Sequence, residues 1–468
     1  MTNDLCEMSL ADVGALIRSK EVSPVEVTRQ VLRRIEERNP RLNAFLTVSA
    51  ELAGEQACAA EREIQKGEYR GPLHGVPVSF KDLIYTQGVR TTAGSKILAN
   101  FVPDSDATVV EKMKRAGAVL VGKNAMHEFA YGITNDNPHY GATRNPWDPE
   151  RTSGGSSGGS GVAVAAGMAF AALGTDTGGS IRIPASFNGI VGLKPTFGRV
   201  SLHNAYPLGY TLDHVGPLAR TVVDAGVVYQ TIAGFDPRDP FSVDQPLGEI
   251  GLRKSLNGLR VGVPEDYFFD AVQPEVERLV RAALPVLQDL GAKVAPLKLS
   301  GMAELTEASR ISLLVEALVV HRKDLEERAN DLGQDVRALL EKGREVSAEE
   351  YMKAQLTRTR IRRQLEQLFQ QVDVLVTPST PLTAFPIGQT KVVLGGKEDD
   401  ARIASTRLLR GFNATGHPAL SVPCGFDSHG LPVGLQIVGR LWGEATVLHV
   451  GYAYEQATDW HKQRPTVF

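Results

Sequence analysis

The chain has 468 residues, of which 42% are hydrophobic and 22% charged, and its formal net charge is -3. These values are typical of a globular protein with a deep core and exclude a collagen-like or disordered chain. The weak negative charge gives no general electrostatic reason to expect nucleic acid or an anionic membrane as a partner. Three cysteines without zinc-site spacing, and an N-terminus without a signal peptide, favour a cytoplasmic protein that does not span a membrane.

The N-terminal part predicts helices followed by a buried strand. Ser23 and Pro24 are typical of a helix start, and Asn39-Pro40 predicts the end of that helix. The pattern then predicts a strand over 44–48, a helix up to Lys66 and a strand over 76–80.

The rest of the chain alternates between helix and strand. Within the glycine- and alanine-rich stretch from Gly154 to Thr196, residues 162–172 predict a helix. The strand over 259–263, the helix over 275–290 and the strand over 293–297 resemble a βαβ unit with parallel strands. The other expected elements are long helices within 303–369, strands over 374–377, 419–422 and 433–438, and a helix over 444–456. This alternation indicates the α/β class.

Residues 117–123 match the opening of a nucleotide-binding P-loop. Their interior, Ala-Val-Leu-Val, instead predicts a buried strand, and Asn124 replaces the Ser/Thr that would hold magnesium. We therefore expect no nucleotide site there.

Residues 154–158 satisfy the Gly-x-Ser-x-Gly pattern of a Ser-His-Asp hydrolase, for which His417 would be a candidate base. The preceding stretch, 145–151, is polar and contains two prolines, so it lacks the strand that this motif requires. His127-Glu128 lacks the second histidine of a zinc protease helix, and we expect no metal site.

Three other segments together supply the parts of an acyl-transfer site: 75–82, 154–160 and 174–182. Two glycines before Ser180 can present several N–H groups to one point, as an oxyanion hole beside a hydroxyl nucleophile. That hydroxyl needs a base. Lys81 ends an apolar strand, where burial can lower the pKa of its amine towards neutrality.

These motifs resemble those of the amidase signature family. The glycine- and serine-rich signature runs from Gly154 to Thr196, and the likeness extends to Asp213-His214-Val215-Gly216-Pro217 and Gly416-His417-Pro418-Ala419-Leu420. The resemblance implies one α/β domain over 1–468, with a single large mixed β-sheet layered between helices. Within it, N-terminal helices would occupy about 1–65 and a catalytic core would contain 75–200.

The resemblance also implies the roles of the site residues. Lys81 would be the base, Ser156, on a cis peptide, would relay the proton, and Ser180 would be the nucleophile. The implied oxyanion hole comprises the backbone of Thr177, Gly178, Gly179 and Ser180, with hydrogen-bonded support from Ser157, Asp176 and Arg182. The family implies no metal or organic cofactor, and a homodimer.

The family contains both free-standing amidases and the A subunit of the tRNA-dependent amidotransferases, which releases ammonia from glutamine. The stretches 134–138 and 203–207 look more like those of the free-standing enzymes. We therefore expect a small-molecule amide as substrate and keep the amidotransferase component as the alternative.

The resemblance assigns the stretch 126–133, upstream of the serines, to the acyl pocket. Tyr131, Gly132 and Ile133 are the expected substrate-binding residues, although Ile133 is equally compatible with the core. Because the stretch is mostly apolar and offers no paired cation, it favours uncharged amides, including anilides and carbamates.

Overall fold

The fold is built around one large mixed β-sheet, seen in a computed structural model that describes residues 4–466. The sheet has 11 strands. In spatial order they are β1 (Phe45–Val48), β3 (Val119–Asn124), β2 (Pro77–Lys81), β6 (Ala171–Thr175), β8 (Val215–Ala219), β7 (Val191–Lys194), β14 (Ala419–Phe426), β15 (Pro432–Gly439), β11 (Val374–Pro378), β9 (Arg260–Pro264) and β10 (Lys293–Leu297). Two short hairpins lie outside it: β4 (Asp136–Asn137) with β5 (Gly141–Ala142), and β12 (Lys391–Leu394) with β13 (Lys397–Asp400).

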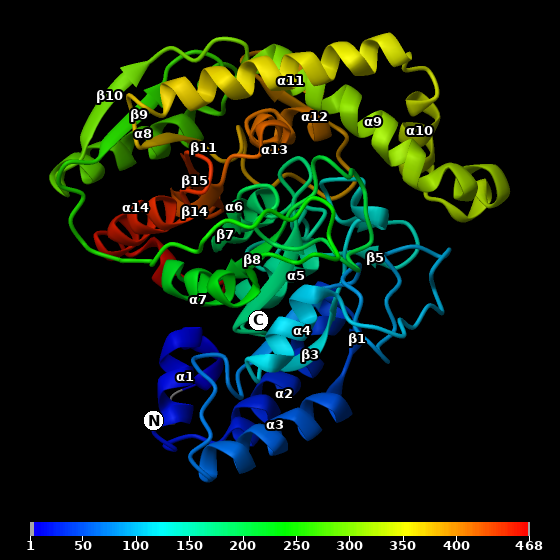
Figure 1. The fold of residues 1–468 in the computed structure, drawn as a ribbon, viewed down its shortest axis with the longest axis vertical. Coiled ribbons are helices and arrows are strands. Elements are labelled where there is room, and N and C mark those ends of the chain that lie inside the picture. Colours follow the sequence, from blue (N-terminus) through cyan, green and yellow to red (C-terminus); the bar gives the residue numbers. More distant parts are fainter. Residues whose placement is uncertain (1–3, 467–468) are drawn as a thin grey trace.

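Helices flank the sheet, as expected for the α/β class (Figure 1). They are α1 (Leu10–Arg18), α2 (Pro24–Leu42), α3 (Ala50–Gln65), α4 (Thr108–Arg115), α5 (Gly158–Ala165), α6 (Arg182–Asn188), α7 (Val222–Ile232), α8 (Pro274–Asp289), α9 (Met302–Glu327), α10 (Gln334–Gly343), α11 (Ala348–Leu368), α12 (Ala401–Thr406), α13 (Arg410–Thr415) and α14 (Glu444–Gln456). Short 3-10 turns cover Leu5–Glu7, Glu128–Ala130, Ala329–Asp331 and Trp460–Lys462. Helices α9 and α11 lie together at the end of the molecule opposite α1–α3 (Figure 1).

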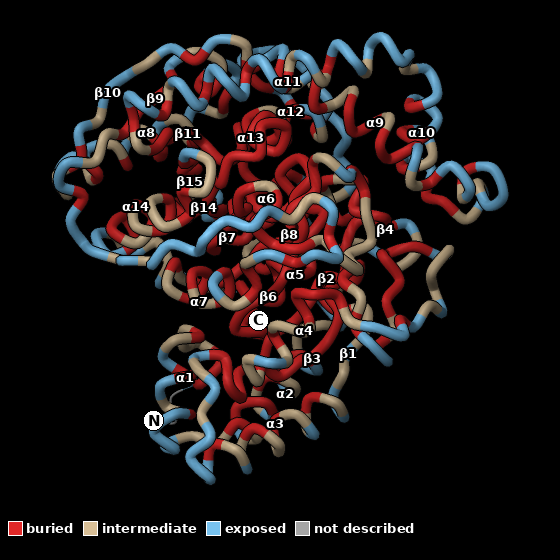
Figure 2. Tube along the Cα trace, viewed as in Figure 1, coloured by how far each residue is buried: buried red, intermediate tan, exposed pale blue. Residues whose placement is uncertain are grey.

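Strands β2, β3 and β6 run parallel to one another, and the site lies in this part of the sheet. Every residue of β2 and β6 is buried. Figure 2 shows that the centre of the molecule is buried and that outer helices such as α11 are largely exposed. Because parallel strands point the same way, the ends of β2 and β6 meet at one edge of the sheet, where α/β proteins place their ligands.

Several expected elements are confirmed with small shifts in their bounds. The βαβ unit is β9–α8–β10, and its two strands pair in parallel. The buried strand expected in place of a P-loop is confirmed as β3. None of the helices within residues 4–466 combines the length and hydropathy needed to cross a membrane.

Two expectations are wrong. Helix α2 does not end at Asn39-Pro40 but includes Pro40 and ends at Leu42, with Asn43 in the left-handed conformation as its cap. Pro40 removes one hydrogen bond from the last turn, where the helix ends two residues later, and the Asn39 side chain accepts the amides of Ala44 and Phe45 beyond that end.

The second error concerns the expected helix over 162–172. Helix α5 ends at Ala165, and Ala171 already begins strand β6. Small side chains there suit close packing in a buried strand as well as in a helix, so composition alone did not separate the two.

Candidate active site

The site begins where strands β2 and β6 end side by side. Lys81 is the last residue of β2 and Thr175 the last residue of β6. The Nζ atom of Lys81 lies 2.8 Å from Ser156 Oγ and 2.7 Å from Thr175 Oγ1. The structure therefore brings the two sequence-predicted residues Lys81 and Ser156 into hydrogen-bond contact and adds a threonine hydroxyl.

Ser156 is held in the turn that precedes α5. Its peptide bond with Gly155 is cis. A Cβ atom at Gly155 would lie 2.9 Å from Asn135 N, so only glycine allows the turn to approach this backbone so closely. The turn is thus packed against the segment that follows the expected substrate-binding residues.

Burial changes the protonation of Lys81. Its side chain has no exposed surface, and desolvation lowers the pKa of the amine to about 7. The carboxylates of Asp213 and Asp176 act in the opposite direction and keep this pKa from falling further. Lys81 can therefore exist as a neutral amine near pH 7, the form that accepts a proton.

Ser180 lies on the loop that leaves β6, next to the Ser156-Ser157 turn. The Ser157 N–H donates to the Ser180 carbonyl oxygen at 3.3 Å. Ser157 also ties the turn to strand β6, because its Oγ donates to Thr175 O and accepts the Thr175 N–H. The Ser180 hydroxyl has no hydrogen-bond partner among residues 4–466, so the structure does not join it to Ser156 Oγ, the expected proton relay.

The carboxylate of Asp176 fixes the shape of the Ser180 loop. It accepts the N–H of Gly179 at 2.7 Å and that of Ile181 at 3.2 Å. Its other partner is Arg182, whose guanidinium forms a buried ion pair with it at 2.9 Å and holds the pKa of Asp176 well below its usual range. Arg182 is anchored in turn by Gln436 and Asn413.

This geometry corrects the expected oxyanion hole in one respect. The N–H of Gly179 is already donated to Asp176, so it is not free for a substrate oxygen. Within the described part of the chain, the N–H groups of Thr177, Gly178 and Ser180 have no acceptor. These three N–H groups are therefore the remaining candidates for binding a substrate oxyanion.

The expected acyl-pocket residues are mostly buried. Tyr131 and Ile133 are 4% and 6% exposed, and Ile133 packs in a small apolar cluster with Ile183 and Phe187. Gly132 lies against the His127 ring with no room for a side chain. Of the three, Tyr131 has the polar group, a hydroxyl without a hydrogen-bond partner among residues 4–466.

A cavity of about 330 Å³ reaches the site from one side. Its lining includes Thr175, Thr177, Asp213, Tyr206 and Phe241. Small-molecule sites of this kind combine apolar walls with a few polar groups. The cavity therefore reaches Thr175, one of the two partners of Lys81, while Lys81, Ser156 and Ser180 are not among the residues that line it.

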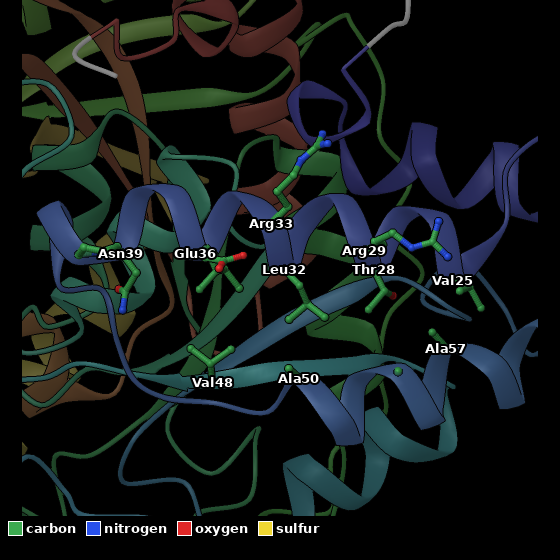
Figure 3. Close-up of a pocket in the computed structure, with 13 residues that line it drawn as sticks. Val25, Thr28, Arg29, Leu32, Arg33, Glu36, Asn39, Val48, Ala50 and Ala57 are labelled. Carbon is green, nitrogen blue, oxygen red and sulfur yellow. The ribbon is translucent and has the colours of Figure 1, made fainter.

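A second groove, of about 860 Å³, lies between α2 and α3 and contains none of these residues. Its walls include Leu32 of α2 and Ala57 of α3 (Figure 3). We assign it no catalytic role.

The two histidines considered as a catalytic base and as a zinc ligand, His417 and His127, have other contacts in the structure. Both ring nitrogens of His417 are away from the serines: Nδ1 lies 2.9 Å from Thr415 Oγ1, and Nε2 has no partner within residues 4–466. Burial lowers the pKa of His417 to about 3, so the ring stays neutral. His127 Nε2 contacts Asp335 at 2.8 Å, and residues 4–466 contain no cluster of metal-ligating side chains.

Sequence reasoning missed three polar residues of this region: Thr175, Asp213 and Arg410. Asp213 begins one of the stretches that resemble the family. Its carboxylate accepts a hydrogen bond from the Thr177 hydroxyl at 2.6 Å. Thr175 could have been found as the last residue of a buried strand. Arg410 lies far beyond Ser180 in the chain and belongs to no motif, so only the fold reveals it.

Comparisons with known proteins identify the chain as an enzyme of amide C–N bond hydrolysis. The model of the Amidase family matches residues 26–448, and the chain belongs to this family. The A subunit of the glutamyl-tRNA(Gln) amidotransferase from Chloroflexus aurantiacus is 43% identical over 99% of both chains.

Solved structures of similar proteins cover nearly the whole chain. One comes from a vestigial protein complex studied for the evolutionary origins of an s-triazine catabolic enzyme; it is 35% identical, has a TM-score of 0.92 and covers 96% of this chain and 98% of that one. Another is a peptide amidase in complex with chymostatin, 32% identical, with a TM-score of 0.86 and coverage of 98% and 99%. Both resemble this chain in its large central sheet.

Proposed function

We propose that this chain hydrolyses a carboxamide through an acyl-enzyme on Ser180. The observation that carries the proposal is the position of the buried Lys81 amine between two hydroxyls, with a pKa of about 7. A base of this pKa is matched to proton transfer at neutral pH.

The proposed reaction uses only side chains and backbone of this chain. The Ser180 hydroxyl attacks the amide carbonyl while its proton passes to Ser156, which passes its own proton to Lys81. The carbonyl oxygen becomes negative and is held by the free N–H groups of the Ser180 loop. The C–N bond then breaks, the leaving nitrogen takes the proton back through Ser156, and water later cleaves the ester by the reverse route.

A serine-directed fluorophosphonate tests this function. We expect one adduct, located on Ser180 by peptide mapping, and no adduct in Ser180→Ala. Labelling of Ser156 or Ser157 alone would contradict the assignment of the nucleophile.

A second candidate is the A subunit of a tRNA-dependent amidotransferase. The curated relatives favour it over a free-standing amidase, because those at 41–43% identity are A subunits of glutamyl-tRNA(Gln) amidotransferases. The motif comparison in the sequence favoured the free-standing enzyme instead. In the second candidate the substrate is glutamine, and the ammonia passes to partner subunits.

Purification under native expression separates the two candidates. A free-standing enzyme cleaves amides as an isolated chain, as a monomer or as the homodimer that the sequence resemblance implies. Co-purification with further subunits, together with glutaminase activity that depends on them, would establish the amidotransferase.

A further inference from the structure

A buried arginine without an acidic partner lies beside the Ser180 loop. Arg410 is the first residue of α13 and is 5% exposed. The position that a Cβ atom would take on Gly178 lies 3.6 Å from Arg410 Cβ and 3.9 Å from its Nη2. The guanidinium is therefore next to one of the candidate oxyanion donors.

The hydrogen bonds of Arg410 are incomplete. Its Nε and Nη2 donate to the single hydroxyl of Thr406, at 3.2 and 2.8 Å, and Nη1 has no partner within residues 4–466. Arg182, on the other side of the same loop, shows the usual arrangement, with a carboxylate and three further acceptors. A guanidinium has five N–H donors, and burying its charge without an anion is costly.

Arg410 forms no ion pair with a carboxylate within residues 4–466, and the side chains that act most strongly on its pKa are Arg402, Tyr131, Arg310 and Tyr267. Arg310 already has an acidic partner, Glu307, at 2.6 Å. Burial and the two arginines lower the pKa of Arg410 to about 10, so it remains a cation at neutral pH. Arg402, Arg410 and Arg310 also act on the pKa of Tyr131, which burial raises, and the Tyr131 hydroxyl likewise has no hydrogen-bond partner within residues 4–466.

We propose that Arg410 binds a carboxylate on the acyl part of the substrate, with Tyr131 as a second donor. This rests on the proposed amide hydrolysis and names its substrate class. Because Arg410 lies so close to Gly178, the carboxylate must be separated from the scissile carbonyl by a short chain. Half-amides of short dicarboxylic acids meet this requirement, and an arginine fork suits a carboxylate.

The same surroundings discriminate between half-amides and glutamine. Glutamine carries an ammonium group beside its carboxylate, and that group would need an acidic partner. Thr406 supplies only a hydroxyl to Arg410, and the strongest neighbours are cations and phenols. We therefore expect a half-amide to be preferred to glutamine. The uncharged substrates expected from the sequence leave Arg410 unpaired.

The test compares succinamate, glutamine and the neutral butyramide in the wild-type protein and in Arg410→Met. We expect succinamate to have the highest kcat/KM, and the substitution to lower that value by at least roughly 30-fold, the lower end for truncating one partner of a buried charge pair. The kcat/KM for butyramide, which has no carboxylate to pair with Arg410, should change by no more than roughly threefold, well below the loss for succinamate.

Arg310→Met is the matched control, because it removes an arginine from the same cluster that already has an acidic partner. It should leave both substrates within roughly threefold of the wild type. Arg410→Lys keeps the charge without the fork and should give an intermediate loss. If Arg410→Met does not fold, the wild-type protein still decides: succinate should slow fluorophosphonate labelling of Ser180, and the neutral succinamide should not.

The outcomes separate the two proposals. Absence of Ser180 labelling overturns the proposed function. Intact labelling with equal losses for succinamate and butyramide in Arg410→Met, or no protection by succinate, overturns the carboxylate site alone. Preference for glutamine with the same dependence on Arg410 would keep the carboxylate site and overturn the half-amide assignment.

Discussion

Two lysines on neighbouring parallel strands, Lys81 of β2 and Lys123 of β3, are equally inaccessible to water but meet different partners. Lys81 contacts two hydroxyls, those of Ser156 and Thr175. Lys123 also contacts two hydroxyls, those of Thr86 and Thr91, and in addition the carbonyl oxygen of Ile84. Burial lowers the pKa of Lys81 to about 7 and that of Lys123 to about 8.

The comparison shows that burial alone does not make a base. Both lysines contact hydroxyls, but only Lys123 also contacts a carbonyl oxygen, which can only accept a hydrogen bond and so keeps one N–H of Lys123 as its donor. A serine hydroxyl both donates and accepts, so Ser156 can pass a proton to Lys81 and take it back. We infer that Lys81 accepts the proton in the reaction, whereas Lys123 stabilises the loop that follows β2 by donating hydrogen bonds to it.

The largest expected effect is that of Lys81→Ala. It should lower kcat/KM by roughly 10²–10⁴-fold, the usual contribution of a general acid-base group, and by more if the three residues act as a unit. Steady-state kinetics with a thermal melt as folding control measure it. A variant that keeps near-normal kcat would remove Lys81 from the mechanism.

Thr175→Val should have a smaller effect, because it removes one of the two hydroxyls at Lys81 while keeping the shape of the side chain. We expect kcat/KM to fall by roughly tenfold, equivalent to one hydrogen bond of about 1.4 kcal/mol. The measurement is kcat/KM at a pH above the titration of Lys81. Unchanged kinetics would mean that Ser156 alone orients the amine.

Unlike the two preceding variants, Lys123→Met should lower the stability of the protein and leave its activity nearly unchanged. The Ile84 carbonyl would keep only the Thr86 hydroxyl as a donor, and Thr86 and Thr91 would each lose the Lys123 contact, which together costs about 1–3 kcal/mol in the free energy of unfolding. Urea denaturation measures this loss, while kcat/KM should stay within roughly threefold. An inactive but stable variant would contradict the division of roles between the two lysines.

Asp213→Asn should shift the pH dependence rather than abolish activity. The Asp213 carboxylate raises the pKa of Lys81, so its removal should lower that pKa and move the acidic loss of activity to lower pH. Burial raises the pKa of Asp213 to about 6, so it is still mostly ionised where Lys81 titrates. A profile that stays in place or moves upward would exclude this coupling.

The sequence predicted the fold class and the residues that belong to motifs. Lys81 was readable because an apolar strand leads directly into it, and Ser180 because two glycines precede it. The helix expected over 162–172 failed because alanine and glycine suit both states. Partners that the fold supplies, such as Thr175 on β6 and Arg410 on α13, could not be read from the sequence, since sequence distance says nothing about which strands and helices meet.

The most direct test of the central claim is the pH dependence of Ser180 labelling by a fluorophosphonate in the wild-type protein. Lys81 with a lowered pKa accepts a proton only when neutral, so labelling should be fast above about pH 7 and fall as the pH drops through that value. The same fall should be absent from the residual labelling of Lys81→Ala. A labelling rate independent of pH between about pH 5 and 9 would contradict a neutral lysine as the base.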